Sequence, residues 1–352
     1  MVTYHVIGLM SGTSLDGVDL AFCSFSKEGD DWQYEIIEAK TYSYTQKWQD
    51  ILINAQELPE RILRDVDLEL GAYYAQLIEN FVNEFQLVPD FISSHGHTAL
   101  HRPEKKVTLQ LGNGEVISRE LRLAVINDFR KRDVELGGQG APLVPIGDRL
   151  LFSEYDLCLN LGGFSNISYE SKGKRIAYDI CPVNMALNDV ARITGEDYDK
   201  DGHMARTGDV HERLLAQLNS LEYYKRPGPK SLGREWYISE FKKKSESRRL
   251  PPVDLLATLV EHMAMQIGNT LNSLSVKNVL LTGGGAYNDF LIERLVQHCN
   301  ADITRPDDML INYKEALIFG FLGVLRIRNE NNVLASVTGA PRDHCSGIIH
   351  RP

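Results

Sequence analysis

Near the start of the chain, two segments rich in strand-forming residues are separated by a short loop of small polar residues. The segments are Tyr4–Met10 and Val18–Phe25, and the loop between them contains glycines at positions 12 and 17. An Asp-Gly pair at residues 16–17 is typical of the corner of a hairpin, because glycine accepts a positive φ. This feature predicts an antiparallel pair of strands whose connecting loop a ligand can approach closely.

The loop also carries side chains that suit phosphate and a divalent cation. Ser11, Thr13 and Ser14 offer hydroxyl donors, while Asp16 and Asp19 could hold a hydrated cation. We interpret the loop as a candidate site for the phosphates of a nucleotide. An ordinary hairpin turn is the alternative.

Length, charge and cysteine usage exclude several classes of protein. A chain of 352 residues favours two domains, and a net charge of −10 argues against nonspecific binding to nucleic acid or anionic membranes. The longest apolar run, Ala316–Leu325, has 10 residues, about half of the ~20 that span a bilayer. The five cysteines form no C-x-x-C pair and the first residues carry no export signal, so we expect a cytoplasmic protein with reduced thiols.

Two series of strands and helices follow one another along the chain. The first series continues with a strand at Tyr34–Tyr44, a helix at Asp65–Phe85 and a short strand from Phe91 to His97. We then expect a hairpin of Val107–Leu111 with Glu115–Ser118, and a further strand at Leu123–Asn127.

The second series repeats this organisation after a glycine-rich and proline-rich stretch at residues 128–145, which we interpret as a crossing between domains. Its expected elements are strands at Tyr155–Leu161, Ser165–Tyr169, Arg175–Asp179 and Asn278–Thr282, with a long amphipathic helix at Asp254–Leu274. The polar segment Glu222–Arg249 is interpreted as a solvated excursion, although Lys230–Glu235 within it offers two cations beside a hydroxyl.

Glycine corners follow three of the expected strands. They are Gly12–Gly17, Gly162-Gly163 and Gly283-Gly284-Gly285. Neither the P-loop pattern nor the dinucleotide-binding G-x-G-x-x-G pattern is present. Corners from both series could converge on one polyphosphate in a cleft between two domains.

A few charged side chains are candidates for chemistry beside those corners. Asp179 ends an expected strand and is placed to act as a general base, although a helix-capping or turn role is the alternative. His97 lies in a histidine-rich strand end whose spacing does not specify a metal site. Arg130 suits a carboxylate or phosphate.

Ordered blocks along nearly the whole chain resemble the anhydro-N-acetylmuramic acid kinases, a branch of the actin-like sugar-kinase superfamily. The blocks include GLMSGTSLDGVDLA at Gly8–Ala21, SHGHTALHRP at Ser94–Pro103 and INDFRKRDVELGGQGAPLVP at Ile126–Pro145. Further blocks are LNLGGFSNIS at Leu159–Ser168, KSLGRE at Lys230–Glu235, LLTGGGAYN at Leu280–Asn288, EAL at Glu315–Leu317 and ASVTGAPRD at Ala335–Asp343.

The resemblance implies an α/β fold of two actin-like ATPase domains, each ribonuclease H-like, with ATP in the cleft between them. On that basis we expect residues 1–130 with the tail 336–352 to form the domain with the phosphate loop. Residues 131–335 would form the second domain, with the general base and the glycines near the adenosine. A homodimer is also implied.

The resemblance further implies the ligands and their residues. Mg-ATP would bind Gly12, Thr13, Ser14, Leu15, Asp16, Gly17, Val18, Asp19, Gly162, Gly163, Gly283, Gly284 and Gly285, with Asp16 as a candidate ligand of Mg²⁺. Asp179 would be the catalytic base, and His97, Arg130 and Glu315 are weaker assignments to the sugar.

The implied reaction is the ATP-dependent, hydrolytic opening of 1,6-anhydro-N-acetylmuramic acid with phosphorylation of O6. Its products are N-acetylmuramic acid 6-phosphate and ADP, in the recycling of cell-wall sugars. One base serves both steps, because water must lose a proton as it attacks C1 while O6 becomes the nucleophile for phosphorus.

One block departs from the family pattern. Where the family has Thr-Gly-Pro-Gly-Asn after its catalytic acid, this chain has Ile180-Cys181-Pro182-Val183-Asn184. Side chains at both glycine positions restrict positive φ, so the substrate geometry could differ. The alternatives are therefore a kinase of this fold for another sugar and a nucleotide-binding sensor of muropeptides without turnover, and retention of Asp179 favours catalysis.

Overall fold

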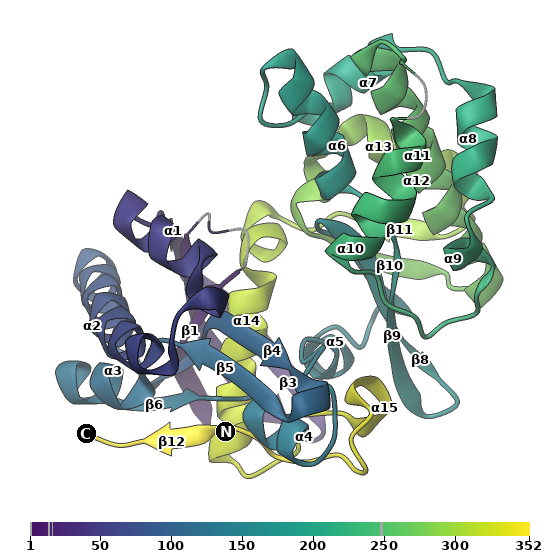
Figure 1. The fold of residues 1–352 in the computed structure, drawn as a ribbon. Helices are drawn as coiled ribbons and strands as arrows, with labels where there is room; N and C mark the ends of the chain where they lie inside the picture. Colours follow the sequence, from purple (N-terminus) through teal and green to yellow (C-terminus); the bar gives the residue numbers. More distant parts are fainter. Residues whose placement is uncertain (1, 13–14, 16, 247–248) are drawn as a thin grey trace. The chain divides into compact units, whose positions relative to one another are not determined.

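The computed structural model describes residues 2–12, 15, 17–246 and 249–352, and it divides into two compact units (Figure 1). The first unit comprises Met1–Leu151 and Tyr313–Pro352, and the second comprises Phe152–Asn312. These extents differ from the expected domains, because residues 131–151 and 313–335 belong to the first unit.

The first unit is built on a mixed sheet in the order β12-β6-β4-β1-β2-β3, with β5 paired to β4. β2 is antiparallel to both β1 and β3, whereas β4 is parallel to β1 and β6 is parallel to β4. The strands are β1 (Thr3–Ser11), β2 (Val18–Glu28), β3 (Asp31–Tyr42), β4 (Phe91–Arg102), β5 (Val107–Leu111), β6 (Ala124–Asn127) and β12 (Ile348–His350).

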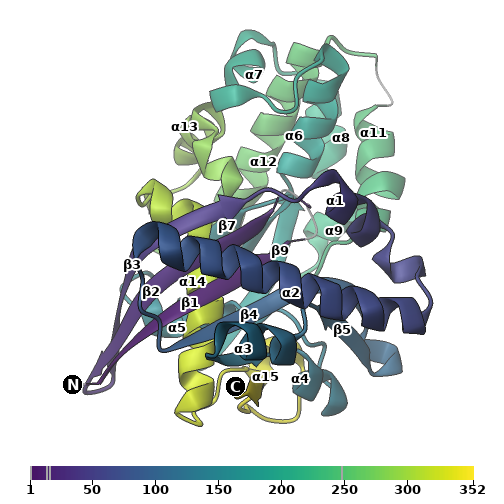
Figure 2. The same cartoon turned by 90° about the vertical axis from the view of Figure 1, so that its left-hand side faces the viewer.

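Two long helices cover opposite faces of this sheet, α2 (Glu60–Phe85) and α14 (Asp308–Ile327) (Figure 2). Alternation along β1 explains the division, since Ile7 and Leu9 pack in the core cluster with α2. Gly8, on the other face, lies so close to α14 that an added Cβ would be 2.0 Å from the carbonyl oxygen of Ala316. This close packing places the chain from Tyr313 onward in the first unit.

Shorter helices complete the first unit. They are α1 (Gln46–Ile53), α3 (Gly114–Leu121), α4 (Lys131–Glu135), α5 (Pro145–Leu151) and α15 (Ala335–Thr338), with 3-10 turns at Ala55–Glu57 and Pro103–Lys105. The expected crossing at residues 128–145 thus belongs within this unit.

The second unit repeats the strand arrangement of the first in the order β11-β10-β7-β8-β9. β8 is antiparallel to β7 and β9, while β10 is parallel to β7 and to β11. The strands are β7 (Leu157–Leu161), β8 (Phe164–Ser171), β9 (Lys174–Pro182), β10 (Asn278–Thr282) and β11 (Asp302–Thr304). In each unit the first strand is central, the next two extend the sheet antiparallel on one side, and parallel strands follow on the other. The two units thus form the two sheets of an α/β fold with a repeated strand order, as expected.

Helices of the second unit enclose a core centred on the long helix α12 (Pro252–Leu274), whose apolar face packs with β7, β9 and β10. The others are α6 (Asn184–Ala191), α7 (His203–Thr207), α8 (Glu212–Asn219), α9 (Glu222–Lys225), α10 (Arg234–Trp236), α11 (Lys243–Ser245) and α13 (Asp289–His298). Turns of 3-10 helix lie at Arg192–Thr194, Lys200–Gly202 and Gly284–Tyr287, and a π-helix at Tyr237–Lys242.

Two expectations about local structure were wrong. Residues 115–118 form part of helix α3, because the Asn113 side chain accepts a hydrogen bond of 3.0 Å from the Val116 amide and so caps a helix. The segment Glu222–Arg249 is not a solvated excursion, since Tyr237 and Phe241 are buried in the core of the second unit. Among the described residues, none of the helices combines the length and apolar character that crossing a membrane requires.

Candidate functional site

The loop after β1 has a different backbone from the one expected. Leu15 has a positive φ of 62°. Gly17 is needed for a different reason, since an added Cβ would lie 2.5 Å from the carbonyl oxygen of Tyr42. The amide of Leu15 approaches the carbonyl oxygen of Gly12 at 3.4 Å. Thr13, Ser14 and Asp16 lie outside the described residues.

Two neighbours of this loop have their side chains turned into the protein. Val18 is fully buried in the core of the first unit, so its side chain is a packing group. The Ser11 hydroxyl, expected to be a donor in the loop, is also buried and lies 2.6 Å from the Tyr44 hydroxyl and 3.1 Å from Nδ1 of His97. Ser11 is therefore a structural partner of His97 and not a free donor for phosphate.

Asp19 and Glu315 are brought into electrostatic contact in the first unit. Asp19 on β2 accepts a hydrogen bond of 2.6 Å from Thr41, and its charge raises the pKa of Glu315 on α14. The main effect on the pKa of Glu315 is an upward shift from lost hydration, which Arg130 and Lys314 oppose. The sequence-predicted Arg130 and Glu315 thus influence each other electrostatically, since Arg130 lowers the pKa of Glu315 and Glu315 raises that of Arg130.

His95 orients Arg130. The Arg130 Nε donates to Nε2 of His95 at 3.0 Å, and one terminal nitrogen of Arg130 donates to the carbonyl oxygen of Gly140 at 2.7 Å. Because an Nε2 that accepts a hydrogen bond is unprotonated, His95 is neutral, and burial holds its pKa well below the usual value. Burial also lowers the pKa of Arg130 to about 10, so the guanidinium remains charged at neutral pH.

Asp133 organises the glycine-rich loop beside Arg130. This carboxylate is completely buried and accepts hydrogen bonds from the Gly140 amide at 2.7 Å and from the Thr338 hydroxyl at 2.8 Å. A Cβ on Gly138 would lie 2.2 Å from it. Asp133 was not among the expected site residues, although an acid four residues before Gly137-Gly138 followed by Gly140 is consistent with a carboxylate that binds loop amides.

Two glycine corners of the second unit meet where β7 and β10 end. β7 and β10 are parallel neighbours, so Gly162-Gly163 and Gly283–Gly285 follow them at the same edge of the sheet. Gly283 has φ at +84°, and an added Cβ would be 2.6 Å from Oδ1 of Asn160 and 2.8 Å from the carbonyl oxygen of Leu161. These two predicted corners are therefore together in the structure, as expected.

The side chain and backbone of Asn184 link these corners to α6. Its side-chain nitrogen donates to the carbonyl oxygen of Leu161 at 3.1 Å. Its backbone amide donates to the carbonyl oxygen of Gly162, also at 3.1 Å. An added Cβ on Gly285 would lie 3.2 Å from Oδ1 of Asn184. The edge is thus a closely packed backbone surface, suited to a ligand that is recognised through amides and small residues.

Asp179 lies on β9 and is held by the segment that precedes α10. One carboxylate oxygen, Oδ2, accepts a hydrogen bond of 2.8 Å from the Leu232 amide, and the Asp179 amide donates to the carbonyl oxygen of Lys230 at 3.1 Å. The Tyr223 hydroxyl donates to the carbonyl oxygen of Asp179 at 2.7 Å. Burial raises the pKa of Asp179 above its usual value, and the Leu232 amide opposes that shift.

The unusual residues after Asp179 fit without left-handed backbone. Neither Cys181 nor Val183 has a positive φ, and Val183 has φ −128° and ψ −97°. Cys181 is fully buried, and burial raises the pKa of its thiol to about 12, so it is a packing residue and not a nucleophile. The backbone at both positions is therefore compatible with a side chain.

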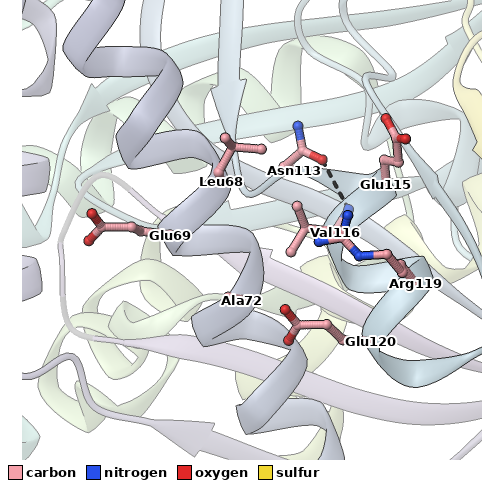
Figure 3. Close-up of a pocket in the computed structure, with 8 residues that line it drawn as sticks. All are labelled: Leu68, Glu69, Ala72, Asn113, Glu115, Val116, Arg119 and Glu120. Atoms are coloured by element: carbon pink, nitrogen blue, oxygen red, sulfur yellow. Dashed lines mark hydrogen bonds between the residues drawn. The ribbon is translucent and has the colours of Figure 1, made fainter.

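A surface pocket of about 510 Å³ lies apart from these groups, between α2 and α3 (Figure 3). Leu68, Glu69 and Ala72 line it from α2, facing residues 113–120. Glu115 and Glu120 add to its negative charge, with Arg119 as a lining cation. That charge is unfavourable for phosphate, and none of the sequence-predicted site residues lines this pocket.

The sequence matches the family model "Anhydro-N-acetylmuramic acid kinase" over residues 4–352. Curated relatives include the anhydro-N-acetylmuramic acid kinases of Sulfurimonas denitrificans and Aliivibrio fischeri, each 34% identical over 98% of this chain and 98% of the relative.

Solved structures with a similar course of the chain have low sequence identity. The activator of the 2-hydroxyisocaproyl-CoA dehydratase from Clostridium difficile, with bound ADPNP, has a TM-score of 0.44 and 14% identity, covering 92% of this chain and 97% of that one. The ROK hexokinase from Thermus thermophilus has a TM-score of 0.39 and 11% identity, with coverages of 92% and 99%. On the match along almost its whole length, this chain belongs to the anhydro-N-acetylmuramic acid kinase family.

Proposed function

We propose that this protein uses ATP to open the 1,6-anhydro ring of 1,6-anhydro-N-acetylmuramic acid and to phosphorylate O6. The products are N-acetylmuramic acid 6-phosphate and ADP, and the role is in the recycling of cell-wall sugars. Membership of the family supports this reaction. The observation that carries it is the way Asp179 is held, with one oxygen fixed and the other available.

The environment of Asp179 suits a general base. Oδ2 is fixed by the Leu232 amide, whereas Oδ1 has no hydrogen-bond partner among the residues that the structure describes. A carboxylate oriented in this way can accept a proton at Oδ1 without rearrangement. The raised pKa makes Asp179 a stronger base than an exposed aspartate.

In the proposed reaction Asp179 takes a proton from water as the water oxygen bonds to C1 of the sugar. The bond between C1 and O6 breaks, and its electron pair stays on O6. O6 then bonds to the γ-phosphorus of ATP, the bond from phosphorus to the β,γ-bridging oxygen breaks, and ADP leaves. Asp179 returns its proton to solvent, so the balance is one water and one ATP consumed for each sugar.

The phosphates of ATP would be bound by the loop Gly12–Asp19 and by the corners at Gly162-Gly163 and Gly283–Gly285. The packing around Gly283 supports this assignment, because an added Cβ would meet Asn160 and Leu161, so glycine lets the two corners lie close together at one end of the sheet. Thr13, Ser14 and Asp16 belong to the same proposal.

A magnesium ion bound with ATP would supply charge neutralisation on the phosphates. Among the described residues, groups of three or more metal-ligating side chains are absent, and this fits Mg²⁺, which takes most ligands from phosphate and water and one or two from carboxylates. Asp19 is the described carboxylate that would face it, beside Asp16. Arg130, Glu315 and His97 would bind the sugar.

Two further properties belong to this proposal. All five cysteines are free thiols, which is typical of the reducing cytoplasm where we place the protein. A homodimer is the proposed assembly, and its mass in solution tests it.

Product analysis tests the proposed function. The purified protein is incubated with ATP, Mg²⁺ and 1,6-anhydro-N-acetylmuramic acid, and ADP and the sugar phosphate are measured by coupled assay and mass spectrometry. We expect equal amounts of ADP and sugar phosphate from the anhydro sugar. Much less sugar phosphate is expected from N-acetylmuramic acid, which lacks the 1,6-anhydro bridge. ATP binding without any sugar phosphate would favour the sensor, and a phosphate on another sugar would favour a different kinase.

A further inference from the structure

A chain of hydrogen-bonded hydroxyls leads to His97 inside the first unit. The Tyr74 hydroxyl lies 2.7 Å from that of Tyr44, which lies 2.6 Å from the Ser11 hydroxyl, and Ser11 lies 3.1 Å from Nδ1 of His97. All four residues are buried, with exposed fractions between 0% for Tyr74 and 5% for Tyr44. A chain with so little solvent contact must place its hydrogens among its own members.

Counting those hydrogens fixes the tautomer of His97. The chain has three hydrogen bonds and three hydroxyl hydrogens, so each bond is supplied when Tyr74 donates to Tyr44, Tyr44 to Ser11 and Ser11 to His97. A hydrogen on Nδ1 would be a fourth donor, and one buried hydrogen would then lack an acceptor among the described residues. Leaving a buried donor unpaired is unfavourable, so Nδ1 is an acceptor and the ring hydrogen is on Nε2.

His97 also remains uncharged at neutral pH. Burial lowers the pKa of His97 to about 4, and a second ring hydrogen at Nδ1 would meet the same lack of an acceptor. Its Nε2 has no hydrogen-bond partner among the described residues and is not one of the fully enclosed polar atoms. This nitrogen therefore carries a hydrogen for which the described residues provide no acceptor.

His95, two residues earlier on β4, has the opposite tautomer. Its Nδ1 lies 2.9 Å from the carbonyl oxygen of Gly96 and must donate, while its Nε2 accepts from Arg130. The two histidines thus differ at Nε2: that of His95 accepts a hydrogen bond from Arg130, whereas that of His97 is a donor without a partner among the residues that the structure describes.

We infer that Tyr74, Tyr44 and Ser11 set His97 as a neutral Nε2–H donor for an uncharged oxygen of the sugar, such as its acetamido carbonyl. The identity of the ligand rests on the proposed function, whereas the tautomer does not. Ser11 and Tyr44 are positioning residues, since they act through His97. The inference explains why a serine next to the expected phosphate loop faces inward.

The tautomer is measured by NMR on protein with ¹⁵N-labelled histidine. Two-bond couplings from ring protons distinguish Nε2–H from Nδ1–H, and the His97→Gln variant identifies the His97 signals by their loss. We expect Nε2–H for His97 and Nδ1–H for His95 in the same spectrum. A protonated Nδ1 on His97, or an equal mixture of tautomers, overturns the inference.

A matched pair of variants tests the direction of the chain. Ser11→Ala removes the donor to Nδ1, so we expect a mixture of tautomers at His97. Tyr44→Phe also removes one buried hydroxyl but leaves Ser11 able to donate only to His97, so Nε2–H persists. If both variants, or neither, change the His97 tautomer, the hydroxyl chain does not set it.

The donor role is measured as the KM for the sugar. His97→Gln keeps an N–H at the position of Nε2 and should retain KM within about threefold, while His97→Leu should raise KM roughly tenfold, as expected for one lost hydrogen bond. Equal KM values in the two variants overturn the donor role. An unreactive wild-type protein with His97 as Nε2–H would refute the proposed function and leave the tautomer standing.

Discussion

The two units share one strand arrangement but have different kinds of residue at the ends of their strands. In the first unit, buried side chains meet there: Ser11 with His97, His95 with Arg130, and Asp133 with the loop at Gly140. In the second unit the corresponding edge is backbone and glycine, with a single acid, Asp179, held by an amide. The same strand arrangement thus carries a network of buried side chains in the first unit and closely packed glycine backbone in the second.

Asp179 should give the largest effect, because it is the acid that the second unit places on its edge strand. Replacing it by Asn in D179N preserves shape and removes the base, so we expect kcat to fall at least about 10²-fold. Binding of ATP should be unchanged in a calorimetric titration.

Asp199 is the matched control in the same unit, since its carboxylate is buried and accepts hydrogen bonds from the amides of Met204 and Ala205. D199N should lower the free energy of unfolding while leaving kcat of the folded protein near the wild-type value. Near-normal turnover by D179N would remove Asp179 from the mechanism.

Gly283 tests whether the backbone surface of the second unit matters for the nucleotide. In Gly283→Ala the new Cβ would meet Asn160 and Leu161 and the residue would keep a positive φ, so we expect a loss of about 2 kcal/mol in stability. Affinity for an ATP analogue should fall roughly tenfold, about 1.4 kcal/mol.

Gly173→Ala is the control for the cost of placing a side chain at a positive φ without a steric clash. Gly173 has φ at +74° and nothing within 4 Å of an added Cβ, so stability should fall while nucleotide affinity stays constant. An equal loss of affinity in both variants would show that the corner at Gly283 has no special role.

Asp133 provides the corresponding test of the first unit. In D133N one carboxylate oxygen becomes an amide nitrogen facing the Gly140 amide or the Thr338 hydroxyl, both of which are donors. Leaving such groups unpaired should lower the free energy of unfolding by about 2 kcal/mol. Because Arg130 donates to the same loop, KM for the sugar should rise several-fold with little change in affinity for ATP, as measured by steady-state kinetics.

Asp30, which is exposed in the turn between β2 and β3, gives the matched control for that measurement. D30N should change neither stability nor KM. Unchanged unfolding of D133N would show that the buried carboxylate does not hold the loop.

The smallest effect is the pH dependence of the base. Because burial raises the pKa of Asp179, the base becomes protonated at a higher pH than an exposed aspartate, and kcat should fall as pH drops through that raised value. The acid limb of the kcat profile should therefore have its midpoint above the usual 3.8. An acid limb at or below 3.8, with the fold intact by circular dichroism, would contradict this role.

The sequence predicted the repeated strands and the glycine corners because alternation, apolar runs and glycine after a strand are local signals. It could not predict that residues 115–118 are helical, since Val116 and Ile117 favour a strand and only the Asn113 cap decides. The extent of the first unit could not be predicted from the sequence either, because the packing of α14 on Gly8 is a contact between segments that are far apart along the chain.

The candidate site shows the same limit. Local patterns were enough to make Asp179 and the corners at residues 162–163 and 283–285 candidates. The buried role of Asp133, and the contacts of residues 223–232 with Asp179, depend on hydrogen bonds between residues far apart in the sequence. A polar segment reads as solvated unless its aromatic residues are known to face the core, as Tyr237 and Phe241 do.

The most direct test of the account is the fate of water oxygen in the reaction. The protein is incubated with 1,6-anhydro-N-acetylmuramic acid, ATP and Mg²⁺ in ¹⁸O-labelled water, and the product is fragmented in a mass spectrometer. We expect one labelled oxygen at C1 and an unlabelled phosphoryl group on O6. A labelled phosphoryl group with no label at C1 would contradict it, because water would then have attacked phosphorus instead of the sugar.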